Sequence, residues 1–273
     1  MKSIKRFAIM FLTLLPFLLF VTSCSTVPLT GRRQLNIVPG PTVLSMSFQQ
    51  YDEFLKTNKL STNEEQTRTV KTVGGKIQRA VERYMAEKKL IDELRGYDWE
   101  FNLIESPELN AWCMPGGKVV VYTGLLPVTR DETGLAVVMG HEVAHAVAKH
   151  GNERMSQALV TQMGGMALSK AIEEKPEETR QLWLAAFGIG AQLGVLLPYS
   201  RLHESEADRL GLIFMAMAGY DPGRAVDFWE RMAHEKGGAG PPEFLSTHPS
   251  DETRIRKLKE LIPEALPYYE KSR

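Results

Sequence analysis

Apolar residues recur every three or four positions between residues 62 and 88, with lysine and arginine between them: Val70, Val73, Ile77 and Val81. This period places the apolar side chains on one face and predicts an amphipathic helix. From residue 97 to residue 104 the pattern changes, and Trp99, Phe101 and Leu103 alternate with other residues. Alternation of this kind predicts a strand.

A hairpin is predicted for residues 110–126, which read NAWCMPGGKVVVYTGLL. The Pro-Gly-Gly segment at 115–117 is typical of a turn, and the β-branched run from Val119 to Tyr122 is typical of a strand. Cys113 lies in the first arm of this hairpin. We expect its lone thiol to be a small packed group rather than a nucleophile.

The next predicted helix begins with the capping-box pattern of Thr129 and Glu132. Its apolar residues continue to about His150, and we expect the helix to stop at Gly151 because glycine is common after helix ends. Residues 152–171 continue as a second helix with apolar residues at helical spacing.

An almost wholly apolar run follows from Leu182 to Leu197. It is shorter than the roughly 20 residues that a membrane-spanning helix needs. The favoured interpretation is a buried core helix, with Gly190 and Gly194 allowing close packing, and a membrane-embedded hairpin is the alternative.

Three more helices are predicted towards the C-terminus. The first opens at Ser200 and closes at Gly219, and the second is capped at residues 221–222 and runs to about Glu235. A flexible loop is expected at residues 236–242, which read KGGAGPP, before a last helix capped by Ser250.

The N-terminal residues are typical of an export signal. A charged start is followed by an apolar run from Phe7 to Val21, which is too short for a comfortable membrane span. The small residues directly before Cys24 resemble a bacterial lipobox, and that resemblance implies cleavage before Cys24 and attachment of lipid to its sulfur. A plain secretory signal with an incidental cysteine is the alternative. Ser25 after the cysteine implies sorting to the outer membrane, again by resemblance.

Composition and charge narrow the choice of partners. The chain has 273 residues, of which 33 are lysine or arginine and 33 are aspartate or glutamate, so its formal net charge is zero. This balance provides no field that favours nucleic acid. The 2 cysteines cannot form a disulfide framework.

The motif that carries chemistry is HEVAH at residues 141–145. On a helix, His141 and His145 lie one turn apart on the same face, so their imidazoles can bind one zinc ion. Glu142 lies beside the first ligand and can act as general base towards a water molecule. Apolar residues surround the motif, and buried polar groups of this kind are costly unless a metal or other partner compensates them.

A third protein ligand is needed, and its position separates the classes of zinc peptidase. Residues 148 and 151 are Ala and Gly, which excludes the HExxHxxGxxH pattern. The acidic candidates are Glu204 and Glu206. Glu206 sits three residues before Arg209, as in an ordinary surface pair, so the spacing favours Glu204 as the ligand.

Glu204 and Asp208 lie four residues apart and therefore on one helix face. Asp208 would then accept a hydrogen bond from a ligand histidine and orient it. The alternative is that Glu204 only pairs with Arg201.

Several motifs in the same order carry a family resemblance: HEVAH, the hairpin at 110–126, SRLHESEADRLG and THPSDETRI. Together with VPLTGRRQLNIVP, they resemble the HtpX-like and CAAX-prenyl-protease-like zinc metallopeptidases, in particular the periplasmic lipoprotein branch of the BepA and LoiP type. The resemblance implies a mainly α fold with a small β-sheet (α+β), in which the active-site helix lies beside an edge strand. It also matches Glu204 to the family's glutamate ligand.

The expected organisation is a signal peptide at residues 1–23, a lipidated tether at 24–45 and one zinc metallopeptidase domain at 46–273. The expected activity is a zinc-dependent endopeptidase at the periplasmic face of the outer membrane, one zinc per chain, with unfolded or misassembled envelope proteins as substrates. The strand at 119–122 is expected to bind substrate along an exposed sheet edge. A chaperone or assembly factor with an idle or gated zinc site is the alternative.

His248 and Arg254, both in THPSDETRI, are candidates for a second donor to the developing oxyanion. His248 has another possible role, because a neutral imidazole could occupy the fourth position on zinc and close the site. We favour the closing role, since an unselective protease tethered among envelope proteins needs restraint.

Overall fold

The computed structural model describes residues 24–192, 196–235, 244, 248 and 252–273. The predicted export signal, the 236–242 loop, Gly194 and the Ser250 cap lie outside the described residues. The chain divides into two compact units, one formed by residues 1–40 and 152–196 and the other by residues 41–151 and 197–273.

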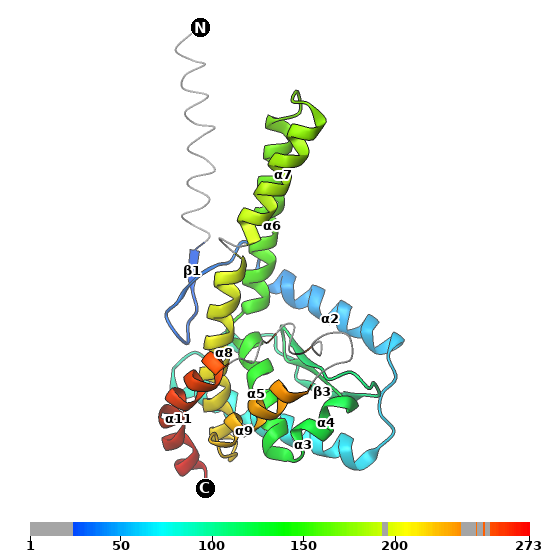
Figure 1. Cartoon of the computed structure of the whole chain (residues 1–273). Helices are drawn as coiled ribbons and strands as arrows, with labels where there is room; N and C mark the ends of the chain where they lie inside the picture. Colours follow the sequence, from blue (N-terminus) through cyan, green and yellow to red (C-terminus); the bar gives the residue numbers. More distant parts are fainter. Residues whose placement is uncertain (1–23, 193–195, 236–243, 245–247, 249–251) are drawn as a thin grey trace. The chain divides into compact units, whose positions relative to one another are not determined.

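The larger unit is mainly helical around a small sheet (Figure 1), which confirms the predicted fold class. Its strands are β3 (Glu100–Ile104), β4 (Ala111–Met114) and β5 (Lys118–Tyr122). Its principal helices are α2 (Gly40–Thr57), α3 (Glu64–Glu87), α5 (Glu132–Val147), α8 (Leu197–Met217), α9 (Arg224–His234) and α11 (Glu252–Ser272). Short turns of helix complete it: η1 (Ile91–Leu94), η2 (Thr123–Leu125) and α4 (Leu126–Thr129).

The sheet has the strand order β3-β5-β4, and this order corrects the predicted substrate edge. β5 lies in the centre, parallel to β3 and antiparallel to β4, so the backbone of residues 118–122 is already paired on both sides. On the outer side of β3, backbone bonds join Ser61 to Leu103 and Glu105 to Lys59. The strand with an unpaired edge within the described sheet is therefore β4, which packs beside α5.

The predicted hairpin turn between β4 and β5 is confirmed. Gly116 and Gly117 have φ values of 93° and 87°, in the region that disfavours side chains. A Cβ at Gly116 would lie 2.5 Å from the Phe48 ring, and one at Gly117 would lie 2.5 Å from Trp99. Both the backbone angles and the close packing therefore require glycine.

Both predicted ends of the HEVAH helix are wrong. Thr129 ends α4, and its hydroxyl donates to the Leu126 carbonyl, so the cap of α5 is Asp131, whose Oδ1 accepts from Gly134 N at 2.8 Å. The chain leaves α4 through Arg130 at φ 67°, and this reversal brings Asp131 to the cap. At the other end, Lys149 at φ 61° reverses the chain, and α6 (His150–Ala171) begins before Gly151.

Helices α5 and α8 cross with their backbones in close approach. A Cβ at Gly140 would lie 2.9 Å from the Gly211 carbonyl oxygen, and a Cβ at Gly211 would lie 2.9 Å from the His141 nitrogen. Only glycine fits at both positions without movement of the backbone. This crossing brings the HEVAH residues of α5 against the acidic residues of α8.

The smaller unit contains β1 (Cys24–Thr26), β2 (Arg33–Leu35), most of α6 and α7 (Glu177–Ala191). β1 and β2 pair antiparallel, and Arg32 binds both carboxylate oxygens of Glu153 on α6. Part of the predicted tether is thus folded, and its predicted boundary at residue 45 falls inside α2.

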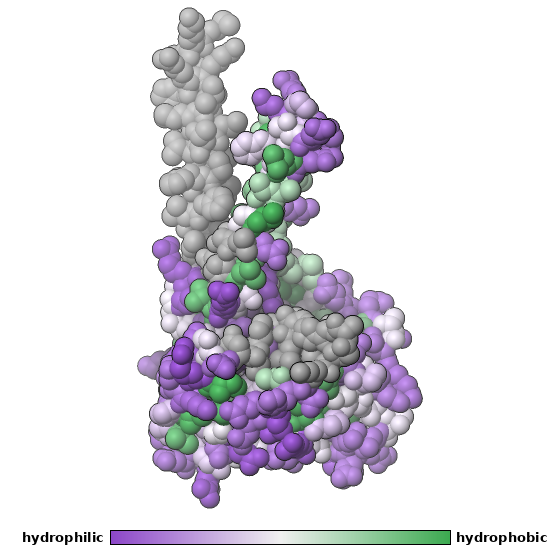
Figure 2. All heavy atoms as spheres, viewed as in Figure 1, coloured by the Kyte–Doolittle hydropathy of each residue, from purple (hydrophilic) through white to green (hydrophobic). Residues whose placement is uncertain are grey.

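The prediction of a buried core helix at Leu182–Leu197 is wrong for the part that forms α7. Helix α7 packs on α6, where the Phe187 ring fills the space beside Gly164, but none of its residues is buried. Leu182, Trp183 and Ile189 are 69%, 56% and 61% exposed. Figure 2 shows apolar side chains along α6 and α7, and polar side chains where the two helices are joined. Gly190 has open space around it rather than a close helix contact.

In the described part of the chain no helix combines the length and apolar character that crossing a membrane requires.

Candidate metal centre

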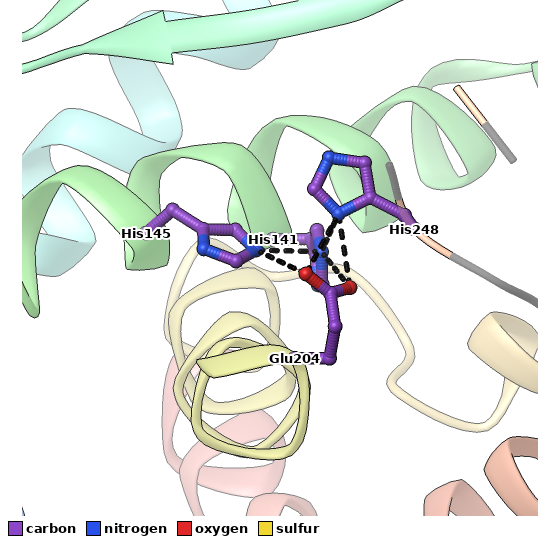
Figure 3. Close-up of side chains that lie close together, drawn as sticks. All are labelled: His141, His145, Glu204 and His248. Atoms are coloured by element: carbon purple, nitrogen blue, oxygen red, sulfur yellow. Dashed lines mark hydrogen bonds and ion pairs between the residues drawn. The ribbon is translucent and has the colours of Figure 1, made fainter. Parts of the chain in front are cut away.

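Four side chains converge in the larger unit (Figure 3): His141 and His145 from α5, Glu204 from α8, and His248. One nitrogen or oxygen from each lies within 4.8 Å of the others. The two Nε2 atoms of His141 and His145 are 3.1 Å apart, and they lie 3.3 and 3.2 Å from the carboxylate oxygens of Glu204. His248 Nδ1 lies 2.9 Å from Glu204 Oε2 and 3.2 Å from His141 Nε2.

These separations fit a single metal ion. Donors at about 2.0–2.1 Å from one tetrahedral zinc lie about 3.3 Å from each other. The distances between neighbouring donors given above are between 2.9 and 3.3 Å. Two imidazoles and a carboxylate are also the ligand chemistry of catalytic zinc sites, and His248 supplies a fourth donor.

The electrostatic environment of His141, His145, Glu204 and His248 favours a positive charge among them. Burial raises the pKa of Glu204, but hydrogen bonds to His141, His145 and His248 outweigh it and hold the pKa well below its usual range. Burial disfavours the charged form of His141, yet hydrogen bonds to Asp208 and Glu204 raise its pKa to about 9. Burial lowers the pKa of His145 well below its ordinary value. A divalent cation can supply the charge that a proton on His141 otherwise provides.

Asp208 lies where the sequence predicts it, behind His141. Its Oδ1 is 3.0 Å from His141 Nδ1, so the imidazole donates there and presents the Nε2 lone pair to the cluster. Burial raises the pKa of Asp208, but the charge of Arg254 and the hydrogen bond from His141 lower it below its usual value.

Arg254 is buried and faces the acidic residues of α8. Its Nε and a terminal nitrogen donate to the two carboxylate oxygens of Asp208 at 3.0 and 2.6 Å, and another nitrogen lies 3.4 Å from Glu204. The guanidinium also stacks over Trp229, 3.5 Å from the ring centroid. These contacts favour a role in holding Asp208 and Glu204 over the expected role as an oxyanion donor.

Glu142 is 4% exposed and lies at the edge of the cluster. Its Oε1 is 3.4 Å from His248 Nε2, so it faces the side of the cluster that His248 covers. The partly buried Cys113 lies nearby, and burial together with the charge of Glu142 raises its thiol pKa well above the ordinary value. Its thiol stays protonated, in line with a packed residue.

Glu206 corrects one prediction, because it is not the surface partner of Arg209. Arg209 instead binds Glu264 through two bonds, at 2.8 and 2.5 Å. Glu206 is 8% exposed and lies 2.9 Å from Nε2 of His150, whose Nδ1 is 2.8 Å from Nδ1 of His145. The sequence pattern marks His150 only as a helix end. His150 lies five residues after His145, a spacing that does not place two residues on the same helix face. The turn at Lys149 brings the two imidazoles into contact.

The fold and the site define a class: a mainly helical metallopeptidase domain in which an HExxH helix and a later helix bring two histidines and a glutamate together. The particular family follows from comparison with known proteins. The family model for peptidase family M48 matches residues 72–262, and the chain belongs to that family. M48 metallopeptidases are zinc-dependent, which agrees with the donor set.

Curated relatives refine this picture. The chain is 39% identical over 168 residues to the mitochondrial metalloendopeptidase OMA1 of Schizosaccharomyces pombe, a match covering 61% of this chain and 48% of that protein. It is 33% identical over 257 residues to the mitochondrial metalloendopeptidase OMA1 of Bos taurus, covering 90% and 47%. It is 28% identical over 177 residues to the β-barrel assembly-enhancing protease of Escherichia coli, covering 58% and 33%.

The chain thus spans about half the length, or less, of these relatives. The family expected from the sequence is confirmed. The lipoprotein branch stays a prediction, because the OMA1 relatives match with higher identity than the bacterial one does.

Proposed function

We propose that this chain is a zinc-dependent endopeptidase that cleaves unfolded or misassembled proteins of the cell envelope. The observation that carries the proposal is the convergence of the buried His141 and His145 with the partly buried Glu204, directly beside Glu142. Metalloendopeptidase activity in the named relatives supports it. The envelope location rests on the predicted export signal and on the bacterial relative.

In this proposal His141, His145 and Glu204 hold the zinc ion. When bound, zinc polarises the scissile carbonyl and increases the acidity of a nearby water. Glu142 accepts the proton of the attacking water and delivers it to the leaving amine. Asp208 keeps the proton of His141 on Nδ1, and Arg254 holds Asp208 in place.

Substrate binding is assigned to the open edge of β4, which replaces the predicted edge at 119–122. An extended peptide could pair with the backbone of residues 111–114, next to α5. Pairing through backbone hydrogen bonds depends little on the side chains of the bound peptide. It therefore suits unfolded chains, whose backbone is accessible, and disfavours folded proteins.

His248 acts in this proposal as a closing ligand. Its Nδ1 supplies the fourth donor, and its Nε2 faces Glu142, where the attacking water would have to lie. Activity then requires His248 to move away. The same contact favours a second candidate function, an assembly factor whose site stays closed and does not turn over.

Zinc content together with casein cleavage separates these functions. The purified wild-type protein should hold one zinc per chain, and Glu204→Gln should lose it because a charged ligand is removed. His248→Ala should raise proteolysis and promote self-cleavage if the residue closes the site. A fall on the order of 100-fold would instead identify a transition-state donor. If neither the wild type nor His248→Ala cleaves while both hold zinc, the assembly-factor function is favoured.

The location carries its own test. We assign Cys24 as the lipidated residue and the periplasmic face of the outer membrane as the site of action. Cys24→Ala should then leave an uncleaved precursor or a form that mild washing releases from the membrane. Normal cleavage and unchanged outer-membrane fractionation of the variant would contradict the lipid assignment.

A further inference from the structure

A chain of three hydrogen-bonding side chains lies on the far side of His145 from Glu204. Figure 3 shows the second ring nitrogen of His145 directed away from the cluster. That nitrogen, Nδ1, is 2.8 Å from Nδ1 of His150, and Nε2 of His150 is 2.9 Å from Glu206 Oε2. His150 is fully buried and Glu206 is 8% exposed, so water does not screen these contacts.

The positions of the protons along the series His145–His150–Glu206 follow from its two end groups, the carboxylate of Glu206 and the metal-facing nitrogen of His145. A carboxylate accepts hydrogen bonds, so Nε2 of His150 carries the proton that points at Glu206. Nε2 of His145 faces the cluster and must be unprotonated to bind a metal, so the ring proton of His145 lies on Nδ1 and is donated to Nδ1 of His150. His145 is left with its lone pair on Nε2, the atom 3.2 Å from Glu204 and 3.1 Å from His141 Nε2.

Each HEVAH histidine is thus supported by a carboxylate, but by different routes. For His141 the carboxylate of Asp208 is in direct contact. For His145 the carboxylate of Glu206 acts through the ring of His150, which the turn at Lys149 directs back towards α5. His203 stacks on His150 with ring centroids 4.2 Å apart and restricts the orientation of its ring.

We propose that His150 and Glu206 are positioning residues that fix the tautomer and ring orientation of His145 for zinc binding. This inference rests on the proposed zinc site and adds to it a relay that holds the second imidazole ligand. Partners of this kind typically change metal affinity by about 10–100-fold when they are removed.

The test is the rate of zinc loss from purified full-length protein, measured with a chromogenic chelator, together with the absorption spectrum of the cobalt-substituted form. His150→Phe keeps the ring volume but removes both hydrogen bonds, and we expect zinc loss about 10–100-fold faster and an altered cobalt spectrum. His150→Asn places an oxygen near the former Nδ1 position. It should restore part of the slow zinc release because it can accept from His145.

Two further variants separate positioning from folding. Glu206→Gln keeps a hydrogen-bond acceptor but loses its charge, so it should show an intermediate rate and serves if His150→Phe does not fold. Glu264→Gln makes the same change outside the relay, where Glu264 binds Arg209, and is the matched control, with a rate close to wild type. Equal rates and spectra for wild type, His150→Phe and Glu206→Gln would overturn the relay, whereas wild-type protein that binds no zinc would overturn the proposed function itself.

Discussion

Helices α5 and α7 are both rich in apolar residues, but they have opposite environments. Every residue of α5 from Gly134 to Val147 is buried, including the polar side chains of HEVAH, whereas α7 has no buried residue. Helix α5 is enclosed by α3, α8, α9 and β4, while within the described residues α7 packs on α6. An apolar run in the sequence therefore indicates only that a helix face can be buried. Whether it is buried depends on how many other helices and strands pack against it.

The difference in burial also determines which chemical properties the side chains of the two helices have. Enclosure removes water from the imidazoles and carboxylates of α5 and α8, so their mutual interactions are strong enough to shift their pKa values. The exposed face of α7 presents apolar side chains to solvent and holds no comparable cluster of titratable groups in the described part of the molecule. Four predictions test this contrast, from the largest expected effect to the smallest.

The largest effect is expected at the buried HEVAH helix. Glu142→Gln removes the proposed general base but leaves the three proposed ligands in place, so turnover should fall by about 10²–10⁴-fold. Casein cleavage measures turnover, and zinc content serves as the control, which should stay at one per chain. Turnover near wild type with full zinc would show that a different group accepts the proton.

A matched pair of apolar substitutions compares the two helices directly. Val138→Ser places a hydroxyl in the core of α5 at a fully buried position, and it should lower the free energy of unfolding by about 3 kcal/mol. Ile189→Ser on α7 changes an exposed side chain and should stay within about 0.5 kcal/mol of wild type. Urea denaturation followed by circular dichroism measures both. A comparable loss in the two variants would mean that α7 is covered in the native protein.

A second matched pair of substitutions compares how closely α5 and α7 pack, at Gly211 against α5 and at Gly190 on α7. Gly211→Ala forces a methyl group against the His141 backbone, so it should cost about 1–3 kcal/mol and weaken zinc retention by separating α5 from α8. Gly190→Ala on α7 meets open space and should be neutral or stabilising by up to about 1 kcal/mol. Thermal unfolding and zinc content are the two readouts. Full zinc retention with unchanged stability in Gly211→Ala would contradict the close crossing.

The smallest effect concerns Trp183, which is 56% exposed, in contrast to Trp229 beside the cluster at 1%. Acrylamide should quench the fluorescence of Trp183 readily, and Trp183→Phe should remove most of the quenchable emission. The measurement is a quenching titration of wild type and variant at several protein concentrations. Quenching that weakens as concentration rises would indicate that copies of the chain cover α7.

Local sequence alone determined the elements whose geometry depends on near neighbours. The helical period at 64–87, the glycine turn between β4 and β5, and the HExxH spacing each depend on residues within a few positions, and the structure agrees with them. The structure places Glu204 among the histidines, as the spacing predicted, but the surface pair of Glu206 with Arg209 on which that choice rested does not form. The role of Glu204 as a zinc ligand stays a proposal.

Tertiary structure decided what depends on distant partners. The central place of β5 follows from its pairing with β3, the buried contact of Glu206 with His150 follows from the turn at Lys149, and the exposure of α7 follows from its few neighbours. None of these can be read from a periodic pattern, because side chains far apart in the sequence meet only after the helices and strands have packed. Backbone periodicity is a local property of the chain, whereas burial and hydrogen-bond partners are properties of the folded molecule.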